Sequence, residues 1–174
     1  MTMDGTAHSV DRWDLIVAHP PCTYLTNAGA RHLYKGGKLN EQRYKQGMEA
    51  RDFFMEFYDA GCEHIAIENP IASKVFELPK YAQIIQPYWF GHPVTKKTCL
   101  WLKNLPELYP TDIVERPQYR EFIQKNGKKR RTCWEMEQKS GKNRAKERSK
   151  TFPGIAEAFA SQWGDYLLRE SDDE

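Results

Sequence analysis

Two short apolar runs, each ended by proline, flank a helical pattern in the first half of the chain. The runs cover residues 13–18 and 64–69. Pro20 and Pro21 follow the first run after His19, and Pro70 follows the second directly. Such runs predict buried strands, because proline cannot donate to a sheet ladder and stops the strand. Between them, residues 41–60 carry apolar side chains at helical spacing. This β-α-β order predicts an α/β fold in which the two strands are parallel and end at one edge of the sheet.

Two reactive side chains fall at that edge. Cys22 follows the first strand behind Pro20-Pro21, and Glu68-Asn69 ends the second strand. A thiolate attacks electrophilic carbon, and a neighbouring carboxyl group can act as the acid that makes the carbon electrophilic. We therefore interpret Cys22 as a candidate nucleophile and Glu68 as its acid partner.

Two other interpretations of the cysteines stay open. Cysteine is among the most buried residue types, and the three cysteines other than Cys22 are expected to be buried, reduced thiols. Alternatively, His19-x-x-Cys22 and Cys62-x-His64 offer four ligands of types that suit zinc. Parallel strands argue against zinc, because these two pairs then lie at opposite edges of the sheet.

Positive charge is concentrated in residues 125–150, which carry 11 Lys and Arg against three acidic residues. The segment has a net charge of +8 and the remainder of the chain −6, although the total is only +2. Such a block suits contact with a phosphate backbone. The candidate DNA contacts in it are Lys128, Lys129, Arg130 and Arg131. The alternative is a solvated loop.

Length and composition are those of one ordinary globular domain. No apolar run is long enough to span a membrane, and the polar N-terminus does not read as a signal peptide, so a cytoplasmic protein is expected. The expected organisation is a polar arm (1–12), an α/β catalytic-like core (13–110), a basic loop or small recognition segment (111–150) and a C-terminal helix packing on the core (151–174).

The order Pro-Cys, helix, Glu-Asn resembles the fourth and sixth motifs of DNA cytosine-5 methyltransferases. The amino-acid sequences of residues 18–27, 67–70, 90–96 and 153–158 are also similar to those of phage-encoded proteins of that group. The resemblance implies a partial methyltransferase-like Rossmann sheet, mainly parallel. It also implies DNA as the partner, host cytoplasm as the compartment and S-adenosylmethionine as the cofactor.

The resemblance implies roles for individual residues. In that family the cysteine attacks C6 of a flipped cytosine, and the glutamate of the sixth motif holds and protonates N3. Carried over, Cys22 is the nucleophile and Glu68 the acid. Pro21 and Asn69 support the site, and Lys96 faces the DNA backbone.

The chain departs from the family at its start. Residues 1–12 contain no counterpart of the glycine-rich first motif, which receives the methionine half of S-adenosylmethionine. The expectation is a sheet without the family's first strands, with an open edge beside residues 13–18 that proteins usually cover. Three hypotheses follow: a half-enzyme completed by a partner chain, a homo-oligomer that covers the edge, or a non-catalytic DNA-binding homologue.

Overall fold

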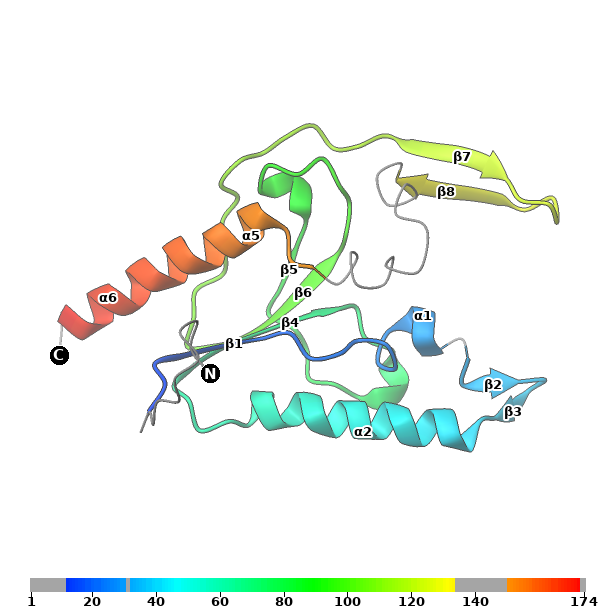
Figure 1. Ribbon diagram of the computed structural model, residues 1–174, viewed down its shortest axis with the longest axis horizontal. Coiled ribbons are helices and arrows are strands. Elements are labelled where there is room, and N and C mark those ends of the chain that lie inside the picture. Colours follow the sequence, from blue (N-terminus) through cyan, green and yellow to red (C-terminus); the bar gives the residue numbers. More distant parts are fainter. Residues whose placement is uncertain (1–11, 31, 134–149, 173–174) are drawn as a thin grey trace, which may run out of the picture. The chain divides into compact units, whose positions relative to one another are not determined.

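The computed structural model of the chain describes residues 12–30, 32–133 and 150–172 (Figure 1). The chain forms two compact units. The first comprises Met1–Gln83 and Cys99–Pro106, and the second comprises Ile84–Thr98 and Glu107–Glu174. Within the described stretches, no helix combines the length and the apolar character needed to cross a membrane.

A four-stranded sheet has the order β1-β4-β6-β5, so that β1 forms one edge. Its strands are β1 (Leu15–Ala18), β4 (His64–Pro70), β5 (Gln83–Ile85) and β6 (Thr98–Lys103). The predicted parallel pairing of β1 and β4 is confirmed, with Ala18 opposite Ile67.

The prediction of a mainly parallel sheet is wrong. The fold is α/β, but β1 and β4 form its one described parallel pair in a mixed, mostly antiparallel sheet. Parallel neighbours need a long crossover connection, usually a helix. Between β5 and β6 the chain contains only a 3-10 turn at Pro87–Trp89, which does not provide one.

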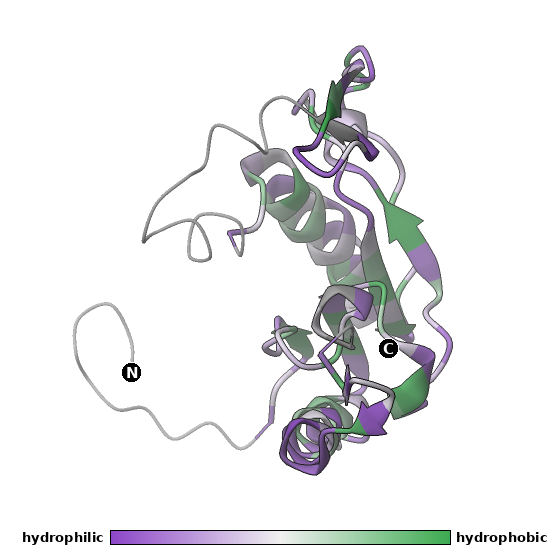
Figure 2. Ribbon diagram, turned by 90° about the vertical axis from the view of Figure 1, so that its right-hand side faces the viewer, coloured by the Kyte–Doolittle hydropathy of each residue, from purple (hydrophilic) through white to green (hydrophobic). Residues whose placement is uncertain are grey.

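The predicted helix is α2 (Glu41–Tyr58), which connects β1 to β4 through the first unit. Asn40 caps its first turn, because the Asn40 side chain accepts a hydrogen bond from the Arg43 N–H at 3.1 Å. Phe54 on α2 is fully buried, and its ring meets Trp101 of β6 edge to face at a centroid distance of 5.0 Å. Figure 2 shows hydrophobic and hydrophilic residues on different parts of the α2 ribbon. One face of the helix therefore belongs to the core.

The segment between β1 and α2 is more ordered than the long loop that the sequence predicted. It contains α1 (Asn27–Ala30) and a hairpin of β2 (Tyr34–Lys35) and β3 (Lys38–Leu39). Gly36 and Gly37 form the turn with φ of 58° and 81°. Positive φ at both central residues is what a tight hairpin turn requires, and glycine adopts it without a steric penalty.

The second unit contains the predicted C-terminal helix. It begins at Pro153 as α5 (Pro153–Ala158), continues through a π-helical turn and ends as α6 (Gly164–Asp172). Trp163 is fully buried and stacks on Phe159 at 4.5 Å. The Gln162 side chain accepts from the Tyr109 N–H at 3.0 Å and donates to the Tyr109 carbonyl at 2.9 Å. These contacts fasten the helix within its own unit.

A β-hairpin occupies part of the predicted basic segment. β7 (Tyr119–Ile123) and β8 (Lys129–Cys133) pair antiparallel and lie side by side in Figure 1. Gly127 in the turn has φ of 77° and donates its N–H to the Gln124 carbonyl at 2.8 Å. The rest of the basic block up to residue 149 and the polar arm up to residue 11 lie outside the described residues.

Replacing Gly47 on α2 by alanine should lower the free energy of unfolding by about 1–3 kcal/mol, because overpacking a filled core forces strain. A Cβ at Gly47 would overlap the ring of Phe76, which is buried in the core. Urea denaturation followed by tryptophan fluorescence measures the change. Gly61→Ala is the matched control, since a Cβ at Gly61 meets no atom within 4 Å. Equal stability of the two variants would contradict this packing.

Candidate functional site

The register of β1 with β4 determines which residues lie beside one another where the two strands end. Ala18 lies opposite Ile67, so the next positions along the two strands are His19 and Glu68. His19 Nδ1 lies 3.0 Å from Glu68 Oε2. The Glu68 side chain is 12% exposed, whereas that of His19 is 42% exposed. The carboxyl end of the parallel pair therefore holds an acid in contact with an imidazole that reaches solvent.

Asn69 links the proline turn to β4. Its side chain is completely buried, and Nδ2 donates to the carbonyl of Pro20 at 2.9 Å. Asn69 Oδ1 is also buried, and no described residue donates to it. Buried polar groups are normally hydrogen-bonded. This oxygen is therefore an unusual acceptor, without a hydrogen-bond donor among the described residues, at the edge that carries Glu68.

Cys22 opens a tight turn directly after the two prolines. The side chain is half-buried, and its carbonyl accepts the N–H groups of Leu25 and Thr26, both at 3.2 Å. Leu25 is fully buried, and its own carbonyl accepts the Ser73 N–H at 2.7 Å. The turn that begins at Cys22 is thus fastened to the segment that follows β4.

Arg43 of α2 holds the same turn from the helix side. Its guanidinium donates to the Thr23 carbonyl at 3.1 Å and lies 4.2 Å from the centroid of the Tyr24 ring. A guanidinium over an aromatic face adds a cation–π attraction to the hydrogen bond. The backbone around Cys22 is therefore held on both sides, by α2 and by the chain after β4.

These contacts define what the edge can do chemically. A thiol follows β1 by one short turn, and a carboxyl group with an imidazole partner occupies the end of β4. Both groups therefore follow the carboxyl ends of adjacent parallel strands, and a thiol and a carboxyl group are the residue types that nucleophilic addition with acid assistance uses.

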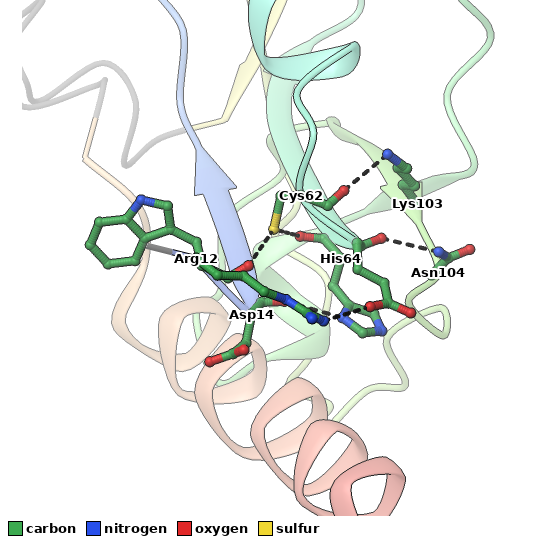
Figure 3. A network of polar contacts seen from close by, with 8 residues as sticks. Arg12, Asp14, Cys62, His64, Lys103 and Asn104 are labelled. Carbon is green, nitrogen blue, oxygen red and sulfur yellow. Dashed lines mark hydrogen bonds and ion pairs between the residues drawn. The ribbon is translucent and has the colours of Figure 1, made fainter. Parts of the chain in front are cut away.

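Cys62 and His64 lie at the other end of β4. Cys62 Sγ donates to the carbonyls of Trp13 and His64, at 3.1 and 3.3 Å, and His64 Nδ1 lies 3.1 Å from the Asp14 carbonyl (Figure 3). His64 pairs with Leu15, at the start of β1, whereas Cys22 follows its end. Among the described residues no group of three or more His, Cys, Asp and Glu could hold a metal ion. Cys62 belongs to a network that joins the amino ends of the strands.

The described residues do not fit S-adenosylmethionine in the manner the resemblance implies. A nucleotide-type cofactor is received where a parallel strand runs into a glycine-rich turn that opens a helix. Both described parallel strands run instead into prolines. The described glycines with positive φ, which are Gly36, Gly37, Gly91 and Gly127, lie elsewhere in the fold. No step through this cofactor is derived.

The residues predicted to face DNA lie in the second unit. Lys128 and Lys129 are exposed at the turn of the β7–β8 hairpin, and Arg130 and Arg131 belong to β8. Lys96 is half-buried, with Nζ 5.8 Å from the centroid of the Phe152 ring.

Further positive charge lies just before β7. A side-chain hydrogen bond with Tyr119 raises the pKa of Arg116 above its ordinary value. Arg116 is exposed, and as an arginine it keeps its charge at physiological pH.

The sequence also predicted other features of the cysteines. Cys22, Cys62 and Cys99 form no disulfide bonds, and Cys62 and Cys99 are buried, as expected.

A cleft of about 280 Å³ is formed by residues that follow β4, together with Trp101, and includes neither Cys22 nor Glu68. It is separate from the candidate site.

The sequence reasoning missed His19 as the partner of Glu68, because it considered this histidine only as a zinc ligand. The register supplies the missing signal, since in a parallel pair the residue after Ala18 falls beside the residue after Ile67. No protein-family model, curated protein or solved structure matches the chain.

Asn69→Ala should lower the free energy of unfolding by about 1–3 kcal/mol, because it removes a buried donor and leaves the Pro20 carbonyl without it. Asn104→Gly is the control. Asn104 donates through the same atom to the Glu63 carbonyl at 3.1 Å but is exposed, so water can replace it, and glycine adopts its φ of 49° without strain. Urea denaturation of both variants measures the difference. A loss for Asn69→Ala no larger than that for Asn104→Gly would show that the cross-link contributes nothing.

Proposed function

We propose that the chain is a DNA cytosine-5 methyltransferase-like protein of phage type, in which Cys22 adds to C6 of a cytosine and Glu68 assists at N3. The observation that carries the proposal is the parallel β1–β4 pair, whose ends bear both groups on backbones joined by the Asn69–Pro20 bond. The order of these residues along the chain is that of the family's motifs, and we assign the sheet to a part of the family's Rossmann-like fold.

The chemistry of the addition balances with this chain's residues and water. The Cys22 thiol loses its proton to water, and the thiolate sulfur forms a bond to C6. The electron pair of the C5–C6 double bond moves toward C4 and N3, where the Glu68 carboxyl group donates a proton. The ring is now an enamine whose C5 can take a proton from water. Loss of a proton from C5 to water, expulsion of the thiolate and return of the N3 proton to the Glu68 carboxylate then restore cytosine.

DNA is the substrate that the charge distribution favours. The β7–β8 hairpin exposes Lys125, Lys128 and Lys129 around its turn, and the major groove of B-DNA admits a two-stranded ribbon. A base must leave the stack before a half-buried thiol can reach its C6. Basic side chains that hold the phosphates would supply binding energy for that opening.

The question of where a methyl donor would bind leads to a second candidate function. Since the described residues do not fit S-adenosylmethionine, a DNA-binding homologue without methyl transfer is the alternative. β1 also lies at the edge of the sheet, where a partner chain or a second copy could pair with it and supply the donor site. The addition to C6 separates these cases, because it needs no donor.

The wild-type protein should release tritium from duplex DNA that contains [5-³H]cytosine, in the absence of any methyl donor. The addition makes C5 exchangeable, so tritium passes to water and is counted directly. Cys22→Ala should abolish the release, and Glu68→Gln should lower it by about 100-fold or more, because Gln cannot protonate N3.

Cys62→Ala is the matched control, since this thiol lies at the opposite end of β4, and it should release tritium at the wild-type rate. A wild-type protein that binds DNA without releasing tritium would leave the non-catalytic homologue as the answer. Release that persists in Cys22→Ala would refute the assignment of the nucleophile.

DNA affinity should depend on salt through the hairpin. The double variant Lys128→Gln and Lys129→Gln should reduce the slope of log K against log salt by about 2, because each lost phosphate contact removes about 0.9. Fluorescence anisotropy of a labelled duplex between 50 and 300 mM salt measures the slope. Lys45→Gln on α2, where Lys45 is exposed and pairs with Glu49, is the control and should leave it unchanged. An identical slope in all three proteins would mean that the hairpin is a solvated surface.

A further inference from the structure

The cleft that follows β4 takes no part in the addition proposed above. It has a volume of about 280 Å³ and is lined by residues of the stretch 71–81 and by Trp101 of β6, all within the first unit. Trp101 is buried, its Nε1 donates to the Pro79 carbonyl at 2.7 Å, and its ring meets Tyr81 edge to face at 5.9 Å. These contacts fasten the wall of the cleft to β6. The cleft is therefore a preformed concavity, as most ligand sites are.

The cleft adjoins the turn that begins at Cys22. The Ser73 N–H donates to the Leu25 carbonyl at 2.7 Å. Ala72 forms an isolated antiparallel bridge with Thr26. The first residue of each pair lines the cleft, and the second belongs to the turn. A group bound in the cleft would therefore lie beside the backbone that carries the candidate nucleophile.

Positive charge predominates in the cleft. Lys74 and Lys80 both line it and are exposed, and none of the ion pairs among the described residues includes either lysine. Glu77 is the acidic residue of the lining, so two cations and one anion leave a net charge of +1. Lysine ammonium groups bind phosphate as point charges. A phosphate group is thus the ligand whose charge suits the cleft.

We propose that this cleft holds a phosphate group of the DNA strand that carries the target base, between Lys74 and Lys80. The inference rests on the proposed function and extends it to residues that the resemblance does not assign. Apolar side chains of the lining, among them Ile71 and Leu78, suit the carbon atoms of the deoxyribose. Phosphate contacts fix the position of a nucleic acid on a protein. A phosphate held here would keep the strand beside the Cys22 turn while the base leaves the stack.

Lysine footprinting of the wild-type chain tests this contact directly. A cytosine-containing duplex should slow acetylation of Lys74 and Lys80 by an N-hydroxysuccinimide ester about 10-fold, because an ammonium group held on a phosphate is shielded and stays protonated. Peptide mass spectrometry measures the rates. Lys45 of α2, which is exposed and lies outside the cleft, is the control and should react equally with and without DNA. Deoxycytidine monophosphate alone, at the same nucleotide concentration, should protect neither lysine of the cleft.

Charge variants separate a phosphate contact from a disturbance of the fold. The double variant Lys74→Gln and Lys80→Gln should weaken duplex binding about 10-fold and reduce the slope of log K against log salt by about 1, because one phosphate contact is lost. Glu77→Gln should instead strengthen binding about 2-fold or more, because it removes a charge of the same sign as phosphate. In tritium release the double variant should raise the KM for DNA and leave the maximal rate unchanged, because the contact is made equally in the ground and transition states.

The outcomes distinguish this inference from the proposed function. Unprotected cleft lysines in a bound complex, or a wild-type salt slope in the double variant, would overturn the phosphate site even if the chain releases tritium. Weaker binding by Glu77→Gln would also overturn it. Protection by deoxycytidine monophosphate but not by the duplex would assign the cleft to a free nucleotide and refute the strand contact. Protection by the duplex without any tritium release would overturn the addition chemistry and support the cleft as a DNA contact of a non-catalytic homologue.

Discussion

The parallel pairing of β1 with β4 sets the position of every other group in the candidate site. With Ala18 opposite Ile67, His19 meets Glu68, and the Pro20 carbonyl meets the side chain of Asn69. A slip of one residue would turn each side chain to the other face of the sheet and break both contacts. The site is therefore a consequence of register, and the register is held by residues that take no part in the chemistry.

The prolines and the neighbouring elements convert this register into a fixed geometry. Pro20 and Pro21 end the strand and limit the conformations of the turn that carries Cys22. Arg43 of α2 and Ser73 after β4 bind carbonyls of that turn from two sides. Preorganisation of this kind can supply a large share of a rate enhancement, because the reacting groups need no further ordering. The conformational entropy of the turn is therefore lost when the chain folds and not when a substrate binds.

The elements predicted best from the sequence are those with strong local patterns. β1, α2 and β4 follow from apolar runs, helical spacing and proline stops, and their order fixes the parallel pair that joins Cys22 and Glu68 at one edge. The direction of β5 and β6 was missed, because strand direction depends on the connection and not on the strands themselves. His19 was missed for a related reason: its contact with Glu68 appears only when the two strands are aligned residue by residue.

The β7–β8 hairpin was hidden by its charge. Lysines and arginines dominate this region and resemble a solvated loop, although Asn126-Gly127 is a known hairpin-turn signal between Ile123 and Lys129. The distribution of burial on α2 was also only partly predictable. Phe53 and Phe54 are adjacent aromatic residues on α2, but only Phe54 packs against Trp101 and is buried. Tertiary contacts, which no local pattern encodes, decide such differences.

The central claim is that Cys22 forms a bond to C6 of a pyrimidine base with the help of Glu68. The most direct measurement is mass spectrometry of the protein after incubation with a duplex that carries 2-pyrimidinone in place of one cytosine, without a methyl donor. This base lacks the exocyclic amino group, so its C6 is more electrophilic and the adduct accumulates. We expect a one-to-one covalent complex, with peptide mapping that places the nucleotide on Cys22 and a much lower yield for Glu68→Gln. A complex attached to Cys62 or Cys99, or no complex under conditions in which the duplex is bound, would contradict the account.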